Sequence, residues 1–239
     1  MKYMGSKARL MKHIKPIIEK ELIGCDYYVE PFAGGMNSIC EIDFGKKIAS
    51  DSNKYLIAMW VSLMNGKRFN HFCDRDKYNK MREQYRGDTD YGFQNDEIGW
   101  YGFVASFNGK FFDGGYSGTS GGRDYIAESA RNIEKQIPKM GNITFHSSGY
   151  AELDIPKNSL IYCDIPYRDT TQYGNSKNFD YEHFYDWCCL QCKRGNNVLV
   201  SEFNIPDDRF KVIWEKEVKT QIGLSNKHNR IEKIFKVEL

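Results

Sequence analysis

The sequence predicts an α/β fold of the Rossmann-like type, interrupted by a small, mostly helical insertion. In residues 1–65, short apolar runs alternate with amphipathic segments of helical length, which is the pattern of strand–helix–strand units. The same alternation returns from residue 141 to the end of the chain. Residues 66–140 between them are rich in charged, aromatic and glycine residues and show no alternating strands. We therefore predict one domain from residues 1–65 and 141–239, with a mixed, mainly parallel sheet and helices on both faces, and an insertion at 66–140.

The composition allows such a globular protein and excludes a membrane-embedded one. The chain has 239 residues, of which 41% are hydrophobic, enough to bury a sizeable core. No run of about 18 apolar residues occurs, and the mean hydropathy is −0.63, which argues against an integral membrane protein. Because the first residues also lack the apolar stretch of a secretory signal, we expect a cytoplasmic protein with no membrane partner.

Charge by itself does not indicate a nucleic-acid partner, because 34 basic and 32 acidic residues leave a net charge of only +2. Basic residues do gather at the two ends of the chain. Residues 1–20 hold six Lys and Arg against one Glu, and residues 211–239 hold seven against four acids. Such ends fit a surface that faces phosphates, and they fit an ordinary solvated surface equally well.

The first elements are predicted in the order helix, strand, glycine turn, short helix, strand, helix. The first helix is expected to begin at Ser6 or Lys7, to be kinked or restarted by Pro16, and to end at Gly24. The elements after it form the layout of a nucleotide-binding α/β unit. They are the strand Tyr27–Glu30, the turn Pro31–Gly35 with a short helix, the strand Lys47–Asp51, and a helix through Leu63 that Ser52 or Asn53 caps.

Within the insertion, Ser106–Asp124 contains six glycines among aromatic and basic residues. We interpret this stretch as a mobile loop or hairpin that is too rich in glycine to pack tightly. After the insertion, strands and a helix are again expected. They are the strands Asn142–His146, Ser159–Cys163 and Asn197–Ser201, the helix Tyr181–Lys193, and two late strands near Lys211–Val218 and Arg230–Val237.

The most informative motif lies at the end of the second strand after the insertion. The run Leu160–Tyr167 brings Asp164, Pro166 and Tyr167 to the carboxyl end of an apolar strand, where ligands bind in open α/β sheets. Taken alone, it fits equally well a strand that ends in an Asp-containing turn beside a core tyrosine. The motif resembles the Asp-Pro-Pro-Tyr signature of Dam-like adenine-N6 DNA methyltransferases of phage or restriction-modification type, with Ile165 in place of the first proline.

This resemblance implies a class I S-adenosylmethionine-dependent methyltransferase fold and methyl transfer to the N6 amine of an adenine flipped out of duplex DNA. The amine is a poor nucleophile because its lone pair is delocalised into the ring. By resemblance, an Asp164 oxygen and the Ile165 carbonyl accept its two N–H bonds and favour a nitrogen whose lone pair can attack the methyl group. Because the second acceptor is a backbone carbonyl, losing the first proline need not remove it. Pro166 fixes the turn, and Tyr167 offers a face on which the base stacks.

Other stretches resemble the cofactor-binding parts of the same family, in the same order along the chain. The glycines of the turn let the backbone approach methionine and ribose closely, and Asp51 can accept bonds from the ribose hydroxyls. By resemblance, Tyr3 packs against the cofactor and Lys7 faces its carboxylate. If the resemblance is set aside, Asp51 is interpreted as a favourable charge at a helix N-terminus and Lys7 as an ordinary surface lysine. The residues that the resemblance assigns to S-adenosylmethionine are Tyr3, Gly5, Lys7, Glu30, Pro31, Phe32, Ala33, Gly34, Gly35, Asp51 and Asp164.

The resemblance also implies that residues 66–140 recognise the DNA target, while residues 1–65 and 141–239 form the catalytic domain. Ser106–Gly109 resembles the Asn-Phe-Asn-Gly stretch that precedes the DNA-reading hairpin of the family, and Gly223–Lys233 resembles its polar loop before the last strand. The alternative for the glycine-rich stretch is a disordered surface loop with no task. The expected DNA-binding residues are Asn108, Lys110, Tyr116 and Arg123.

Two departures from the family pattern keep other functions open. Many relatives carry an Asp, used to hold the adenine of the cofactor, where Gly149 stands, and Ile165 replaces a proline. One alternative is a methyltransferase that acts on RNA adenine or on protein glutamine, although glutamine enzymes typically carry Asn where this chain has Asp164. The other alternative is a catalytically inactive DNA-binding relative.

We expect double-stranded DNA and S-adenosylmethionine as partners, no metal, and a monomer or weak homodimer. Cys188, Cys189 and Cys192 are spaced like part of a metal site, but no second Cys/His cluster lies at zinc-ligand spacing. We therefore interpret the cysteines as reduced structural thiols.

Overall fold

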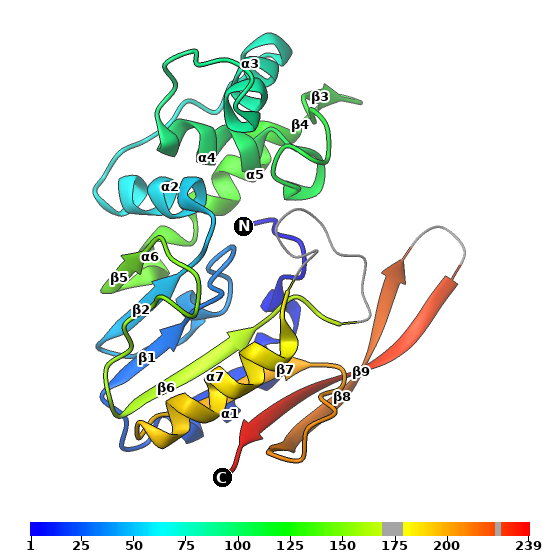
Figure 1. Ribbon diagram of the computed structural model, residues 1–239. Coiled ribbons are helices and arrows are strands. Elements are labelled where there is room, and N and C mark those ends of the chain that lie inside the picture. The colour runs from blue at the N-terminus through cyan, green and yellow to red at the C-terminus, as the bar shows by residue number, and fades with distance from the viewer. Residues whose placement is uncertain (169–178, 223–225) are drawn as a thin grey trace. The chain divides into compact units, whose positions relative to one another are not determined.

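The computed structural model describes residues 1–168, 179–222 and 226–239, with the side chains of residues 219–229 outside that description. The chain, which Figure 1 shows as a ribbon, divides into two compact units. Unit 1 contains Met1–Pro16 and Ala33–Leu153, and unit 2 contains Ile17–Phe32 and Asp154–Leu239.

The chain begins with a short 3₁₀ helix, Lys7–Arg9, in which the Ser6 side chain caps the N-terminus. Helix α1 follows over Met11–Glu21. The predicted restart at Pro16 does not occur, because the helix continues through this residue. Pro16 is exposed, so water can satisfy the carbonyl that loses its helical donor. The helix also ends before Gly24, the predicted terminus.

The two parallel strands of unit 1 lie within one residue of their predicted bounds. Strand β2 (Lys47–Ser50) is fully buried and pairs in parallel with β5 (Ile143–His146). Helix α2 (Lys54–Met64) begins at Asn53, whose side chain accepts hydrogen bonds from two backbone N–H groups at 3.1 and 3.2 Å. Asn53 rather than Ser52 is therefore the cap. The short helix predicted after the glycine turn is a 3₁₀ helix at Ile39–Glu41.

Residues 66–140 are mostly helical, as predicted. Every residue from Ile98 to Val104 is buried, because the apolar helix that contains them packs mainly against α2 and also against the neighbouring helices of residues 66–140. A small hairpin of β3 (Thr119–Ser120) and β4 (Arg123–Asp124) lies in the glycine-rich stretch. The helices are α3 (Arg75–Arg86), α4 (Asn95–Val104), α5 (Tyr125–Glu134) and α6 (Ile137–Met140).

The glycine-rich stretch packs tightly, so the prediction that it could not is wrong. Phe112 is 1% exposed, and its ring centroid lies 5.3 Å from that of Tyr78. The ring centroids of Phe111 and of Phe103 in α4 lie 4.7 Å apart. A Cβ at Gly102 would come within 2.3 Å of the Phe111 ring, which shows that glycine is what lets the ring approach the helix backbone. Glycine therefore makes room for the aromatic rings here, whereas we had expected a high glycine content to prevent tight packing.

The part of unit 2 that the structure describes contains five strands in the order β1-β6-β7-β9-β8. The first three are parallel, and β9 is antiparallel to both of its neighbours. Together with the parallel pair β2 and β5 of unit 1, this confirms a mixed, mainly parallel α/β fold. The strands are β1 (Tyr27–Glu30), β6 (Ser159–Asp164), β7 (Asn197–Glu202), β8 (Phe210–Ile222) and β9 (Asn226–Val237).

The last two strands are longer than predicted. Residues 226–233 belong to β9 instead of the expected polar loop, and residues 223–225 lie outside the described residues. The prediction depended on apolar alternation, whereas a two-stranded antiparallel ribbon tolerates polar residues along its length because its cross-strand pairs can be polar. Lys216 faces Glu232 in this ribbon, for example, and Glu215 faces Lys233.

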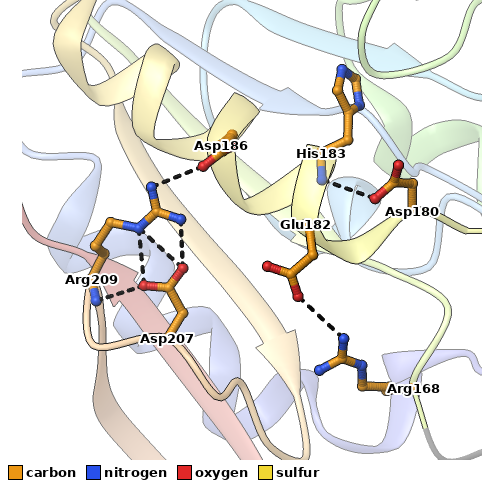
Figure 2. Close-up of polar contacts among 7 residues, drawn as sticks. All are labelled: Arg168, Asp180, Glu182, His183, Asp186, Asp207 and Arg209. Atoms are coloured by element: carbon orange, nitrogen blue, oxygen red, sulfur yellow. Dashed lines mark hydrogen bonds and ion pairs between the residues drawn. The ribbon is translucent and has the colours of Figure 1, made fainter.

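Helix α7 (Tyr181–Lys193) has the predicted bounds and packs on β7 and β9 (Figure 1). Arg209, just before β8, links this helix to the segment between β7 and β8 (Figure 2). Its guanidinium lies 2.9 Å from Asp186 of α7 and 2.6 Å from Asp207. The hydrogen bonds from Arg209 lower the pKa of Asp207, which keeps that carboxyl group ionised.

Candidate active site

In unit 2, strand β6 delivers the Asp-Ile-Pro-Tyr motif at its carboxyl end. The strand ends at Asp164, which stands opposite Ser201 of β7 in parallel register. Asp164 is partly buried, whereas Ile165 and Tyr167 are buried. The burial of Ile165 gives a reason for an apolar residue at this position, because its side chain joins the core while its backbone forms the turn.

The backbone after Asp164 is held by side chains from two other elements. Tyr181 of α7 donates its hydroxyl hydrogen bond to the Pro166 carbonyl at 3.0 Å. Glu202, the last residue of β7, accepts a hydrogen bond from the Arg168 N–H at 3.0 Å. These bonds satisfy one acceptor and one donor of the turn, so the turn has a defined conformation.

Tyr167 is fixed by its hydroxyl group and by an edge contact. The hydroxyl donates a hydrogen bond to the carboxylate of Glu232, which is buried on β9. The Phe203 ring meets Tyr167 edge-on, with centroids 4.6 Å apart and an angle of 89° between the planes. Burial raises the pKa of Tyr167 well above its ordinary value, so the hydroxyl stays protonated and acts as a donor.

Helix α7 is also tied to the residue that follows Tyr167 (Figure 2). The Arg168 guanidinium lies 3.3 Å from a carboxylate oxygen of Glu182 in the first turn of the helix. Asp180 caps the same turn by accepting the His183 N–H at 3.0 Å. The start of α7 thus contacts the motif at Pro166 through Tyr181, and the residue after the motif, Arg168, through Glu182.

Sequence reasoning did not single out Glu202 and Glu232. They are 1% and 3% exposed, and both bond directly to the turn or to its tyrosine. A buried carboxylate costs free energy unless hydrogen-bond donors surround it. An acidic residue within a predicted core strand is therefore the signal that could have found them.

In unit 1, the opening segment lies against the glycine turn. A Cβ built at Gly34 or Gly35 would come within 2.8 or 2.7 Å of Tyr3, so neither position has room for a larger residue. Asp51, directly after β2, accepts hydrogen bonds from the Gly34 N–H at 3.0 Å and from the Asn53 N–H at 2.9 Å. Tyr3, the two glycines and Asp51 therefore lie together within unit 1.

The groups around Asp51 fit the nucleoside part of S-adenosylmethionine. Burial raises the pKa of Asp51 above its ordinary value, although the two backbone N–H bonds act in the opposite direction. A carboxylate offers about four acceptor positions, and these two bonds leave capacity for sugar hydroxyls. An aromatic side chain, closely packed glycine backbone and a carboxylate are together a suitable donor and acceptor set for a nucleoside.

Lys7 is buried at the start of the 3₁₀ helix, which excludes its interpretation as a plain surface lysine. Its ammonium group lies 3.5 Å from the carbonyl of Gly5, a residue with a positive φ of 79°. The opening motif thus forms a tight turn that brings the lysine inward.

An acidic side chain lies beside Gly149, where many relatives carry Asp. A Cβ built at Gly149 would come within 2.6 Å of a Glu152 carboxylate oxygen. The loop is bound to β2, because the Ser50 hydroxyl donates a hydrogen bond to the Ser148 carbonyl at 2.8 Å. A carboxylate, that of Glu152, therefore lies beside position 149 although the residue at this position is glycine.

The insertion carries the four residues that the sequence assigns to DNA, Asn108, Lys110, Tyr116 and Arg123. Asn108 and Arg123 are exposed, and Asn108 adopts a left-handed conformation with φ 55°. Arg123 lies 2.5 Å from Glu128. Tyr116 is partly buried and donates its hydroxyl hydrogen bond to the Cys73 carbonyl at 2.6 Å. Tyr116 therefore has a packing role in the structure, whereas Asn108 and Arg123 face solvent.

Within residues 1–168, 179–222 and 226–239, no three His, Cys, Asp or Glu side chains are grouped so that they could hold a metal ion. Nor does any helix in these same ranges have the length and apolar character needed to cross a membrane. All seven cysteines are free thiols.

Two comparisons with known proteins agree with the motifs. Residues 3–108 match the family model for D12 class N6 adenine-specific DNA methyltransferases. The type II methyltransferase M.FokI of Planomicrobium okeanokoites is 22% identical to this chain over 222 residues, an alignment that covers 80% of the chain and 32% of that relative. The chain thus spans less than half the length of M.FokI. These matches confirm the resemblance to adenine-N6 DNA methyltransferases, which the family model carries over residues 3–108.

Proposed function

We propose that the protein transfers the methyl group of S-adenosylmethionine to the exocyclic N6 amine of an adenine flipped out of duplex DNA. We further propose that it acts in the cytoplasm, as an enzyme of phage or restriction-modification type. The observation that carries the proposal is the Asp-Ile-Pro-Tyr turn at the carboxyl end of β6, where ligands bind in open α/β sheets. It stands in a chain whose first part matches an adenine-N6 methyltransferase family.

Asp164 and the Ile165 carbonyl are the proposed acceptors for the two N–H bonds of the target amine. The Pro166 carbonyl already accepts the Tyr181 hydroxyl, which favours the Ile165 carbonyl for this role. Two acceptors for its N–H bonds favour an amine nitrogen whose lone pair is available. Because the turn already holds both acceptors in place, they do not have to reorient during the reaction. The proton that the amine loses after transfer leaves through Asp164 or water.

Tyr167 is the proposed stacking platform for the flipped adenine. Its hydroxyl is bonded to Glu232 and its ring meets the edge of Phe203, so both the tilt and the rotation of the ring are restricted. A restricted aromatic ring loses little conformational entropy when a base stacks on it. This supports a role for the ring rather than for the hydroxyl in contacting DNA.

S-adenosylmethionine supplies an electrophilic methyl group when it is bound. We propose that Asp51 accepts bonds from its ribose hydroxyls, that Tyr3 packs against it, and that Lys7 faces its carboxylate. Glu152 is the proposed acceptor for the amine of its adenine, in place of the acid that Gly149 does not provide. The other proposed contacts are Gly5, the turn Glu30–Gly35 and Asp164.

Residues 66–140 are the proposed target-recognition part of the chain, and residues 1–65 and 141–239 the proposed catalytic domain. The exposed positions of Asn108 and Arg123 support a contact with DNA, as does the cationic Lys110. Tyr116 supports recognition indirectly, because its bond to the Cys73 carbonyl anchors the stretch that carries these residues.

A parallel transfer assay tests the proposal. The purified protein is incubated with methyl-labelled S-adenosylmethionine and, in separate reactions, unmethylated plasmid DNA, total RNA and cell protein. We expect label in DNA, recovered as N6-methyladenine after digestion. Label in RNA or protein instead of DNA would contradict the proposal, as would cofactor and DNA binding without transfer. Sequencing modified adenines in DNA from expressing cells then gives the target site.

A further inference from the structure

A chain of buried polar groups in unit 2 leads to the stacking tyrosine. The hydroxyl oxygens of Tyr162 and Ser201 lie 3.0 Å apart, and Ser201 donates to a Glu232 carboxylate oxygen at 3.3 Å. Tyr167 donates its hydroxyl to the same oxygen. All four side chains are buried. The chain therefore joins β6, β7 and β9 to the Asp-Ile-Pro-Tyr turn.

The strand register explains why these groups meet. Ser201 stands opposite Asp164 on one side and opposite Ile234 on the other. Because side chains two positions apart in a strand share a face, Tyr162 lies on the face of Asp164, and Glu232 lies on the face of Ile234. The sheet thus presents the hydroxyls and the carboxylate on one face, next to the acid that begins the motif.

Packing alone does not explain a carboxylate at this position. A buried carboxylate is costly unless it is well bonded, and an apolar residue of similar volume would fill the same space without that cost. What Glu232 provides is a directional acceptor for the hydroxyl of Tyr167. Without it, the ring keeps the edge contact with Phe203 but loses the restraint on its far end.

We propose that Glu232 is a positioning residue, which holds the Tyr167 hydroxyl so that the ring is already oriented when the target base arrives. The inference rests on the proposed function, in which Tyr167 stacks on the flipped adenine. A group that is oriented in advance does not have to be ordered during base binding, so the benefit appears in the rate of transfer. Glu232 acts through the hydroxyl of Tyr167 and does not contact the cofactor or the base.

A double-mutant cycle tests this role. The values of kcat and KM are measured with methyl-labelled S-adenosylmethionine and unmethylated plasmid DNA for wild type, Tyr167→Phe, Glu232→Leu, Glu232→Gln and the double variant Tyr167→Phe/Glu232→Leu. We expect Glu232→Leu to lower kcat about threefold to tenfold, as for the loss of one hydrogen bond, with little change in KM. Glu232→Gln keeps an acceptor and should retain most of the rate.

The decisive comparison is between Tyr167→Phe and the double variant, which should have the same kcat because Glu232 has no hydroxyl left to hold. Additive losses, or wild-type kcat in Glu232→Leu, would overturn the inference. If Glu232→Leu does not fold, Glu232→Met, which fills a similar volume without an oxygen acceptor, replaces it in the same comparison with its Tyr167→Phe double variant. Glu217→Gln, an exposed acid on β8, is the matched control and should be unchanged.

The outcome also separates this inference from the proposed function. A wild-type protein that transfers no label to DNA contradicts the proposed function, and it also refutes the positioning role, which depends on that function. A wild type that methylates DNA while the double variant loses more than Tyr167→Phe leaves the proposed function intact and refutes the positioning role alone. Calorimetric affinity for S-adenosylmethionine should stay within about twofold of wild type in every variant, because the altered bond lies at the base-stacking side chain.

Discussion

Asp51, directly after β2, accepts a hydrogen bond from the Gly34 backbone N–H at 3.0 Å. A second bond, from Asn53 at 2.9 Å, makes the same carboxylate an organiser of the glycine turn and of the start of α2. Burial nevertheless raises the pKa of Asp51, so folding alone does not favour its charged form. A buried carboxylate of this kind is a candidate for ligand binding in addition to its role in holding the turn.

The cofactor assignment predicts that Asp51→Ala and Lys7→Ala weaken S-adenosylmethionine binding more than DNA binding. Each removes a hydrogen bond or ion pair to the ligand, and we expect its dissociation constant to rise by about tenfold or more. Calorimetric titration measures the cofactor, and fluorescence anisotropy measures DNA. Lys139→Ala, at an exposed ion pair of unit 1, is the control. Unchanged cofactor affinity in both test variants would refute the assignment.

Asp164→Ala should abolish most methyl transfer while the protein stays folded. Under the proposed function, the substitution removes one of the two acceptors for the attacking amine, and losing one such oriented group lowers kcat by about a hundredfold to a thousandfold. The rate is measured by label transfer to plasmid DNA, and folding by circular dichroism. Asp208→Ala, at an exposed acid of unit 2, should behave as wild type. Activity above one tenth of wild type in Asp164→Ala would contradict its role.

Substitutions of Tyr167 should separate the ring from the hydroxyl. Tyr167→Ala removes the stacking surface, which contributes about 1–3 kcal/mol per base, and should be severe. Tyr167→Phe keeps the ring and should lose only about threefold to tenfold in kcat, the cost of the missing hydrogen bond to Glu232. Tyr185→Phe is the control, because among the described residues the buried Tyr185 hydroxyl has no hydrogen-bond partner. Equal losses in the Ala and Phe variants of Tyr167, measured by label transfer, would exclude stacking as its role.

The double variant Lys110→Ala/Arg123→Ala should weaken DNA binding and make it less sensitive to salt. Each lost phosphate contact lowers the log–log slope by about one unit, so a decrease of up to about two is expected. Anisotropy titrations at several salt concentrations measure the slope. Cofactor affinity should not change. An unaltered slope would mean that another segment contacts the phosphates.

Phe112→Ala should destabilise the insertion by about 3–5 kcal/mol, the cost of truncating a buried phenylalanine. Phe107→Ala, five positions earlier and 57% exposed, is the matched control and should have little effect. Chemical denaturation measures the free energy of unfolding. For the same reason, replacing residues 111–116 with a glycine–serine linker should unfold the insertion rather than alter site selectivity alone. Comparable losses in the two alanine variants would mean that Phe112 is not part of the core.

The sequence by itself determined the local elements of this protein and the place of its main motif. Strands β1, β2 and β6 and helix α7 lie within a residue or two of their predicted bounds, because buried strands and capped helices have signals within their own residues. The position of Asp164 at the end of β6 follows from the same local pattern. The family match over residues 3–108 agrees with the opening motif and the glycine turn found from the sequence.

The tertiary structure decided which distant residues support the motif. Glu232 lies 65 positions from Tyr167, and no local pattern connects the two until β7 and β9 pair. The packing of Phe111 against Gly102 likewise depends on contacts that a local count of glycines cannot reveal. Secondary structure follows from neighbours along the chain, whereas the hydrogen bonds and close contacts that orient a site are formed across strands and helices, where only the folded backbone sets the distance.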